Sequence, residues 1–386
     1  MRSPRRRGRQ MSARQMSASL MSGAPGGGRF AGVRKIAVFR PNAVGDFVFA
    51  LPALHALKRA YPDAELVLLG LPWHAAFLEG RPGPVDRVIA VPPMAGVGLP
   101  PDVPDGGAAQ RFVRAMRGEG FDIACQMYGG GRYSNPLVAS FGARLTIGFR
   151  ADGAPPLDRC VRHAEPNNRR LALLEVAALA GACEVTLGQE LAVTPADRDE
   201  AARVLSESGA GPVLPPLVLL QPGSTDPRRC WPAASFAAVG DALARMGAQV
   251  AVNGTAAEAP LVGRVTDAME ARAIDLSGKL GLGGLCALIE GAACVVSNDT
   301  GPLHLALAIG TPAVGMFWLT NLIDGTPLRQ GLLRAALSLR QECPECGAPN
   351  LSSRCAHDAS FVADVPVGQV VAMAAEILHA RRGGVV

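Results

Sequence analysis

The stretch FRPNAVGDFVFALPAL, residues 39 to 54, joins a short apolar run to a helical pattern. KIAVFR (35–40) predicts a buried strand, and the pattern after it predicts a helix from about Asp46 to Arg59. At the turn between them, Gly45 relaxes the backbone. Asp46 adds a charge that either caps the helix or performs chemistry. A strand, a polar turn and a helix in this order are typical of a parallel α/β sheet.

The same unit recurs in two series along the chain. The first continues with ELVLLG (65–70), DRVIAV (86–91), FDIACQM (121–127) and LTIGF (145–149), and the second contains PLVLLQPG (216–223), AQVAVNG (248–254), AIDLSG (273–278), CVVSND (294–299) and AVGMFW (313–318). Helices are predicted at about 168–182 and at about 367–381. A third is predicted to begin after Thr194, which would cap it, with Pro195 at its first position. We therefore predict two doubly wound α/β domains joined near residues 183 to 195.

The composition agrees with two globular domains. The chain has 386 residues, 49% of them hydrophobic and 18% charged, which exceeds the usual size of one domain. We assign 34–190 to an N-terminal domain, 191–365 to a C-terminal domain and 366–386 to a final helix. No stretch reaches the roughly 20 apolar residues that span a bilayer. Nine cysteines without a signal peptide indicate a reducing cytoplasm.

The remaining segment, 1–33, is basic, and we expect it to be disordered. Residues 1 to 20 hold six arginines and no acid, so the 38 basic and 33 acidic residues of the chain become 32 and 33 beyond them. The formal charge of +5 therefore belongs to this tail, and we expect no nucleic-acid partner. The tail lacks the apolar core of a secretory signal, and Met11, Met16 and Met21 are alternative starts. Weak binding to a membrane surface or a partner is the other interpretation of its charge.

An aspartate or a glycine falls just past the end of four predicted strands: Asp46, Gly223, Gly254 and Asp299. Ligands of a doubly wound sheet bind outside the carboxyl ends of its strands, so two facing domains would direct these turns into one cleft. In SNDTGPLHLALAIGTPAV (297–314), the helix that opens at Thr300 has an N-terminus suited to phosphate, although Asp299 or Thr300 as a simple cap is the alternative.

Two further loops contain groups that suit a nucleotide. QPGSTDPRRCWP (221–232) has hydroxyls and two adjacent arginines, whose forked donors pair well with phosphate oxygens. A solvated loop with incidental charges is the alternative there. In NGTAAEAP (253–260), Glu258 stands where a ribose-binding acid would lie.

Together these segments resemble one family. FRPNAVGDFVFALPALHALKRAYPDAELVLLG, the mid-chain PGS…RRCWP and SNDTGPLHLALAIGTPAVGMF are similar to glycosyltransferase family 9, the bacterial lipopolysaccharide heptosyltransferases, over roughly residues 34 to 380. The resemblance implies a GT-B fold, with two Rossmann-like doubly wound parallel-sheet domains that face each other across a cleft. The first domain would bind the acceptor and the second the nucleotide sugar. The final helix would cross back onto the first domain.

The resemblance also assigns roles. The aspartate of the first Gly-Asp motif is the proposed catalytic base of the family, which here is Asp46, with Asn42 and Gly45 in the acceptor-side loop. Because an inverting transfer needs one carboxylate to accept the proton of the acceptor hydroxyl, we favour chemistry over capping for Asp46. The donor-binding residues would be Ser224, Thr225 and Arg229 at the phosphates, Glu258 at the ribose, and Asp299, Thr300, Gly301 and His304 at the sugar diphosphate.

The implied function is inverting, metal-independent transfer of a sugar, with ADP-heptose as the expected donor and no cofactor required. The acceptor would be a lipopolysaccharide core or related glycan at the inner membrane surface, so we expect a cytoplasmic protein, peripheral at that membrane. Another nucleotide sugar, a protein or capsule acceptor, and a non-catalytic nucleotide-sugar-binding protein are the alternatives. One departure affects donor binding: the family often has Lys-x-Trp-Pro where this chain has arginine at 229, and the two cations are not interchangeable at a phosphate.

A cysteine-rich segment, CPECGAPNLSSRCAHD (343–358), lies outside these motifs. Cys343 and Cys346 have the spacing of metal ligands, with Cys355 and His357 available as third and fourth ligands. A structural zinc or iron site and a loop of reduced thiols both fit the pattern. A metal there would hold the loop together rather than take part in catalysis.

Overall fold

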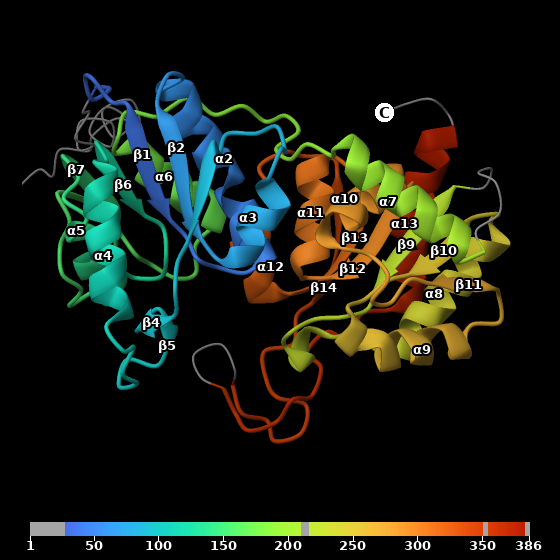
Figure 1. The fold of residues 1–386 in the computed structure, drawn as a ribbon. Helices are drawn as coiled ribbons and strands as arrows, with labels where there is room; N and C mark the ends of the chain where they lie inside the picture. The colour runs from blue at the N-terminus through green and yellow to red at the C-terminus, as the bar shows by residue number, and fades with distance from the viewer. Residues whose placement is uncertain (1–27, 210–215, 350–353, 383–386) are drawn as a thin grey trace, which may run out of the picture.

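Two parallel sheets of six strands form the framework of the molecule (Figure 1). The computed structural model describes residues 28–209, 216–349 and 354–382. The sheets have the orders β3-β2-β1-β6-β7-β8 and β11-β10-β9-β12-β13-β14, and every strand pair within them is parallel. Each order is that of a Rossmann sheet, with the switch point between β1 and β6 in one and between β9 and β12 in the other. The predicted pair of doubly wound sheets is therefore confirmed.

The first sheet contains β1 (Lys35–Phe39), β2 (Glu65–Gly70), β3 (Arg87–Ala90), β6 (Ile123–Gln126), β7 (Leu145–Arg150) and β8 (Arg159–Arg162). Its helices are α2 (Val44–Ala60), α3 (Pro72–Leu78), α4 (Ala108–Glu119), α5 (Ser134–Ala139) and α6 (Arg169–Ala178). The second sheet contains β9 (Leu217–Gln221), β10 (Gln249–Val252), β11 (Ala273–Asp275), β12 (Cys294–Asn298), β13 (Ala313–Trp318) and β14 (Leu333–Ser338). Its helices are α7 (Pro195–Glu207), α8 (Ala233–Arg245), α9 (Ala259–Ala268), α10 (Leu282–Gly291), α11 (Gly301–Ile309), α12 (Leu319–Gly325) and α13 (Val367–Arg382), with short 3₁₀ turns η1 (Pro227–Arg229) and η2 (Ala256–Glu258).

The helices form layers that the strand alternation explains. Along β1, Ala37 and Phe39 face α4 and α5, whereas Ile36 and Val38 face the opposite side. On that inner side, one apolar cluster joins α2, α3 and α6 to α7, α10 and α11, and it includes residues of both sheets. The outer face of the second sheet packs against α8, α9 and α13. A layer of helices from each half therefore lies between the sheets, and the two layers meet where α2 packs against α11.

Two edge strands were not predicted. β8 reads RCVR and β14 reads LRAALS, and both lie at the edge of their sheet with half-buried side chains. Edge strands lack the continuous apolar run of a central strand, so periodicity does not reveal them. In the Pro/Gly-rich segment 92–107, β4 (Met94–Ala95) and β5 (Gly98–Leu99) form a small separate sheet.

The final helix does not cross back as expected. α13 packs against α8, β12, β13 and β14. Its buried residues Val370, Ala374, Ile377 and Leu378 belong to the apolar cluster on the outer face of the second sheet. Burial of this face against its own sheet is the physical reason for the difference.

The predicted disordered tail, 1–33, is also partly corrected. Residues 1–27 lie outside the described residues. The part from 28 to 33 is ordered, because the Phe30 amide donates to Tyr61 Oη at 2.8 Å and Val33 packs against the shared core.

Polar contacts also join the two halves of the molecule. Arg81, after α3, forms a bidentate buried pair with Asp197 of α7 at 2.6 and 3.1 Å. Asp197 is also the acid of the capping box at the predicted cap Thr194. Arg170 of α6 is buried and donates to the carbonyl of Gly325 in α12 at 2.7 Å.

Glu190 lies in the connection between the halves. Its amide donates to the carbonyl of Ala308 at 2.9 Å, and one carboxyl oxygen is buried without a hydrogen-bond partner among the described residues. Burial raises the pKa of Glu190 to about 7, although the nearby charges of Arg170 and Arg329 oppose the shift.

Replacing this carboxyl should make the protein less sensitive to pH. Because the folded pKa of about 7 lies above the unfolded value of 4.5, the unfolded chain loses this proton first and the free energy of unfolding falls as pH rises between those values. We expect Glu190→Gln to be more stable than wild type at pH 8, by on the order of 2 kcal/mol, and similar at pH 4. Urea unfolding at the two pH values measures this.

The exposed Glu184→Gln is the matched control, since Glu184 lies in the same connection with its side chain 74% exposed. Equal pH dependence in wild type and Glu190→Gln would contradict the assignment.

Candidate active site

A cavity of about 410 Å³ lies between the two sheets, at the carboxyl ends of β1, β9 and β12. It is therefore next to the switch points of both sheets, where doubly wound folds bind ligands. Nine of the predicted site residues line it: Gly45, Asp46, Thr225, Arg229, Glu258, Asp299, Thr300, Gly301 and His304.

The N-termini of α2 and α11 meet at this cavity. A Cβ atom on Gly45 would make ordinary van der Waals contact with the Cα of Gly301, at 3.7 Å, so the two turns lie close together. Neither N-cap residue, Ala43 or Thr300, makes a side-chain capping hydrogen bond. The unpaired amides of both helices and their partial positive charge therefore remain available to a ligand.

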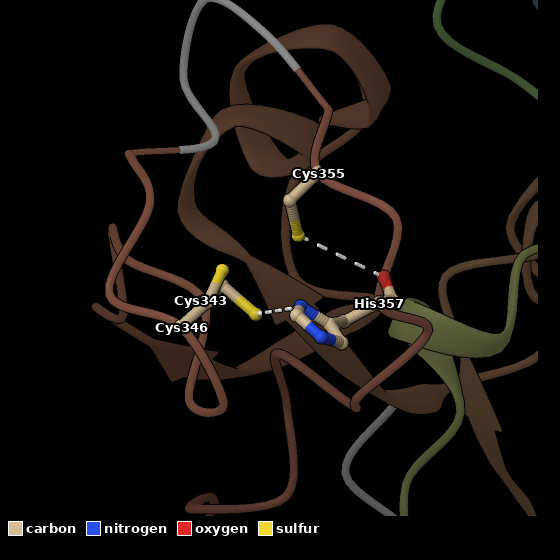
Figure 2. Close-up of side chains that lie close together, drawn as sticks. All are labelled: Cys343, Cys346, Cys355 and His357. Carbon is tan, nitrogen blue, oxygen red and sulfur yellow. Dashed lines mark hydrogen bonds between the residues drawn. The ribbon is translucent and has the colours of Figure 1, made fainter.

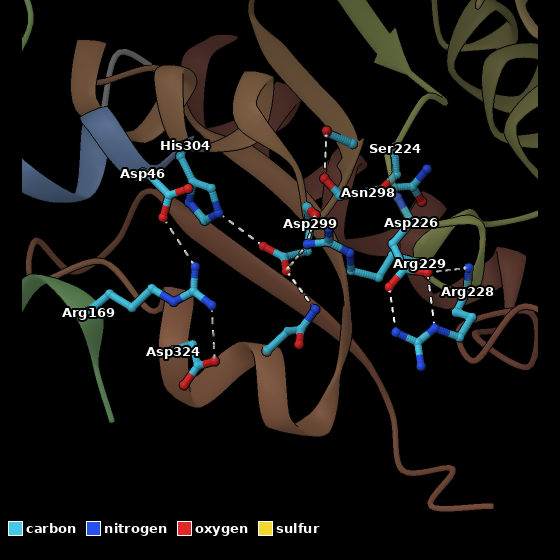
Figure 3. A network of polar contacts seen from close by, with 12 residues as sticks. Asp46, Arg169, Ser224, Asp226, Arg228, Arg229, Asn298, Asp299, His304 and Asp324 are labelled. Atoms are coloured by element: carbon cyan, nitrogen blue, oxygen red, sulfur yellow. Dashed lines mark hydrogen bonds and ion pairs between the residues drawn. The ribbon is translucent and has the colours of Figure 1, made fainter. Parts of the chain in front are cut away.

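Asp46 is in the first turn of α2 but does not cap it. Its carboxylate lies 3.4 Å from Arg169 Nη1 (Figure 3). It also lies 3.5 Å from Arg40 Nη2, and its side chain is 28% exposed. The backbone carbonyl of Asp46 also accepts from Arg40 Nε at 2.8 Å. Two guanidinium groups thus fix this carboxylate at the cavity wall.

Arg169 connects Asp46 to the other half of the molecule. Its second amino group lies 3.7 Å from Asp324 Oδ2 in α12 (Figure 3). Burial raises the pKa of Asp324, while the charge of Arg169 opposes the rise. One arginine therefore spans the cavity between a carboxylate of each half.

Asp299 is buried at the end of β12 and has three partners. His304 Nε2 lies 3.0 Å from Oδ1, Asn321 Nδ2 donates to Oδ2 at 3.0 Å, and Arg229 Nη1 lies 3.6 Å from Oδ2. Burial alone would raise the pKa of Asp299, but the hydrogen bond from His304 and the charges around it hold it below the ordinary value. Burial lowers the pKa of His304. An ionised Asp299 beside a neutral imidazole selects the tautomer with the proton on Nε2.

The loop after β9 presents Arg229 to the cavity. Arg228 forms a short-range pair with Asp226, at 3.0 and 2.7 Å, and does not line the cavity. Arg229 donates to the Asp299 carbonyl at 3.3 Å, and its Nε is buried without a partner among the described residues. A buried, unpaired donor beside a helix N-terminus suits an anionic ligand.

Glu258, in the η2 turn after β10, lies against the start of the loop after β9. Its carboxylate accepts from the Thr255 amide at 2.8 Å and from the Thr255 hydroxyl at 3.0 Å. A Cβ atom on Gly223 would lie 2.0 Å from Glu258 Oε1, so a side chain at 223 would displace the Glu258 carboxylate. Glu258 is thus both a local cap and part of the cavity wall.

Two predicted site residues do not line this cavity. The Ser224 hydroxyl accepts from the Asp226 amide at 3.4 Å, within the loop itself. Asn42 lines an adjoining cavity of about 220 Å³. The adjoining cavity reaches Asp46, Arg40 and Arg169 from the side of the first sheet.

Several lining or supporting residues were missed from the sequence: Arg40, Arg169, Asn321 and Asp324. Arg40 directly follows β1, and this position is the one signal that could have identified it. The others depend on contacts between residues that are far apart in the chain.

The cysteine-rich segment forms a compact cluster away from the cavity (Figure 2). The ligand atoms of Cys343, Cys346, Cys355 and His357 all lie within 4.8 Å of one another. Cys343 Sγ and His357 Nδ1 are 3.8 Å apart, and His357 Nε2 lies 3.7 Å from Glu345 Oε2. A tetrahedral zinc with Zn–S of about 2.3 Å separates its sulfur ligands by about 3.7 Å, so this donor set fits with a small contraction. A carboxylate on the second nitrogen is the usual partner of a metal-bound histidine.

Comparisons with known proteins agree with this geometry. Residues 109–350 match the model of glycosyltransferase family 9 (heptosyltransferase). The chain is 24% identical over 304 residues to lipooligosaccharide heptosyltransferase 2 of Haemophilus influenzae, covering 74% of this chain and 84% of that protein.

Solved structures show the same fold. A glycosyltransferase family 9 protein from Veillonella parvula has a TM-score of 0.75 at 19% identity, covering 92% of this chain and 99% of that one. The ADP-heptose LPS heptosyltransferase II of E. coli has a TM-score of 0.68 at 20% identity, covering 90% and 99%. The family resemblance and the GT-B fold are thus confirmed. The chain belongs to glycosyltransferase family 9 and is a glycosyltransferase with two Rossmann-like sheets that face one cleft.

Proposed function

We propose that this protein is an inverting glycosyltransferase that transfers heptose from ADP-heptose to a hydroxyl of a lipopolysaccharide core or a related glycan. The observation that carries the proposal is the meeting of two uncapped helix N-termini, with Asp46 on one and Asp299–His304 on the other, in a single cavity. The relatives named above, whose names refer to heptosyl transfer, support the choice of sugar.

The second half of the molecule would bind the donor. The α11 N-terminus at Thr300 and Gly301 offers backbone amides to the diphosphate, and Arg229 adds a forked cation beside it. Thr225 would add a hydroxyl, and Glu258 would accept from the ribose. Ser224, which lies outside the cavity, would act by shaping the loop.

The first half would bind the acceptor. The adjoining cavity, which contains Asn42, reaches the same carboxylate of Asp46, so an acceptor hydroxyl can approach it from the side opposite the donor. Gly45 faces Gly301 across the approach of the two helices, so the two substrates would meet there.

In the proposed reaction, Asp46 accepts the proton of the acceptor hydroxyl as its oxygen bonds to the anomeric carbon. The bond from that carbon to the diphosphate oxygen breaks on the opposite face, which inverts the configuration. The departing charge falls on the phosphates, where Arg229 and the α11 amides stabilise it. Because these groups supply the positive charge, we propose that turnover needs no divalent cation at the cleft, which a rate measurement with and without added Mg²⁺ tests.

The acceptor would lie at the inner membrane surface, with the protein peripheral to it in the cytoplasm. None of the helices in the described part of the chain has the length and apolar character needed to cross a membrane. We also propose that the Cys343–His357 cluster binds a structural zinc or iron ion, because three thiolates and an imidazole suit either metal.

Removal of the Asp46 carboxylate should abolish most turnover while donor binding persists. We expect Asp46→Asn to lower kcat by about 10²- to 10⁴-fold, since it removes the proton acceptor, with ADP affinity changed less than threefold. Release of ADP from ADP-heptose with a lipopolysaccharide-core acceptor measures the rate. Asp63→Asn is the control, because Asp63 is an exposed carboxylate beyond the far end of α2. Full activity of Asp46→Asn would remove Asp46 from the mechanism.

Nucleotide preference tests the donor. A thermal-shift panel of ADP, UDP, GDP and CMP should show stabilisation by ADP, about 2.7 kcal/mol at 100 times its dissociation constant. Stabilisation by UDP or GDP instead would exclude ADP-heptose but keep a nucleotide-sugar transferase. If none of the four shifts the melting temperature, donor binding in this cavity is contradicted.

Arg229 should contribute to donor affinity through its charge. We expect Arg229→Ala to weaken ADP binding roughly 10- to 100-fold, as for the loss of a charge-assisted hydrogen bond, and Arg229→Lys to weaken it less. Calorimetric titration measures both. Arg245→Ala is the matched control, since that side chain is 67% exposed on α8. Unchanged ADP affinity in Arg229→Ala would show that the phosphates bind elsewhere.

A further inference from the structure

The Cys343–His357 cluster lies in an unusually long connection. This segment runs from the end of β14 at Ser338 to the start of α13 at Val367, and its described residues form one isolated bridge, Glu342 to Pro349. Connections of this length without helix or strand are uncommon in compact domains, since few backbone bonds fix them. Yet Cys343, Phe361 and Val362 are buried in the core of the second half.

The end of this connection is hydrogen-bonded to the loop after β9 that carries Arg229, residues 222–232, called the donor loop below. The Phe361 amide donates to the carbonyl of Arg228 at 2.7 Å. Three residues further along the donor loop, Trp231 Nε1 donates to the Val365 carbonyl at 3.1 Å. These two bonds lie on either side of Arg229, so the strip 361–365 holds the donor loop at Arg228 and Trp231, which flank the proposed phosphate-binding residue.

Aromatic packing reinforces the contact. Phe361 stacks on Trp318 at the end of β13, with ring centroids 4.4 Å apart and planes 30° apart. The Arg228 guanidinium carbon lies 5.9 Å from the ring centroid of Trp318. Trp318 Nε1 donates to the carbonyl of Arg340, at the start of the connection, at 2.8 Å. The beginning and the end of the connection therefore converge on one tryptophan beside the donor loop.

The cluster lies between those two ends. The carbonyl of Cys343 accepts from the Gly347 amide at 2.9 Å, which closes a tight turn around Cys346, and Gly347 has φ of +69°, a conformation that favours glycine. Cys355 and His357 come from the second part of the connection. A metal bound by all four would cross-link its two parts.

We infer that this cross-link positions the donor loop: metal binding at Cys343, Cys346, Cys355 and His357 holds the 361–365 strip against Arg228 and Trp231, and thereby orients Arg229 toward the donor phosphates. The inference rests on the proposed metal and on the proposed role of Arg229. It makes the four ligands positioning residues for donor binding, although they lie outside the cavity.

Cys346→Ser tests the inference with little damage to the core, because Cys346 is exposed. Cys183→Ser is the matched control, since Cys183 is an exposed thiol outside the cluster. Metal content by mass spectrometry, ADP affinity by calorimetry and folding by circular dichroism are measured on each purified full chain. We expect about one zinc or iron per wild-type chain, its loss in Cys346→Ser, and ADP binding at least tenfold weaker with the circular dichroism spectrum retained. Cys346→His, which keeps a metal ligand, should restore both metal and affinity.

Trp231→Phe tests the hydrogen bond between the donor loop and the 361–365 strip, because it keeps an aromatic side chain but removes the donor to the Val365 carbonyl. It should retain the metal and weaken ADP binding. If Cys346→Ser does not fold, the metal-free wild type, made with a chelator, takes its place and should bind ADP at least tenfold more weakly than the metal-loaded form. A wild-type chain without metal would overturn the metal site. Metal lost from Cys346→Ser with ADP affinity unchanged would overturn the positioning role alone, and unchanged ADP affinity in Arg229→Ala would separately place the fault in the proposed donor site.

Discussion

The close approach of the α2 and α11 N-termini, at Gly45 and Gly301, is the constraint on which the active-site geometry depends. A Cβ atom on either residue would make ordinary van der Waals contact with the other turn, at 3.5–3.7 Å, so there is room between the turns for little more than a methyl group. Each helix starts at a switch point of its sheet, and both sheets have the same strand order. Their meeting therefore places the ligand-binding edges of two Rossmann sheets in one cavity, with amide donors on both sides.

Some charged groups near the two helix N-termini pair with each other across the halves, whereas others face the cavity. Arg170 and Arg81 are buried and join the two halves through Gly325 and Asp197. Asp46, in contrast, faces the cavity between two guanidinium groups, and buried Asp299 is satisfied by His304 and Asn321. Groups that hold the halves together are thus paired internally, whereas Asp46 and Arg229 keep an exposed oxygen or an unpaired N–H for substrates.

Much of this arrangement could be predicted from sequence because its signals are local. Central strands such as β1 and β12 are continuous apolar runs, and the turns after them carry the glycines and acids that line the cavity. Edge strands β8 and β14 and the docking of α13 were missed or wrong, since half-buried strands and the choice of a helix partner depend on tertiary packing. Arg169 was missed because arginine is common in this chain and its partner Asp46 is more than a hundred positions away.

The packing of α2 against α11 between the two sheets limits how this enzyme can admit its substrates. Leu54 of α2 and Leu305 of α11 belong to one continuous apolar core with strand residues from each half, such as Val38 and Val295. Wide separation of the halves would expose that surface to water at a cost of about 25 cal/mol for each Å². Hinge opening on the scale of a whole domain is therefore expensive for this molecule. Substrates would instead enter through rearrangement of loops at the rim, and the two halves should melt together as one cooperative unit.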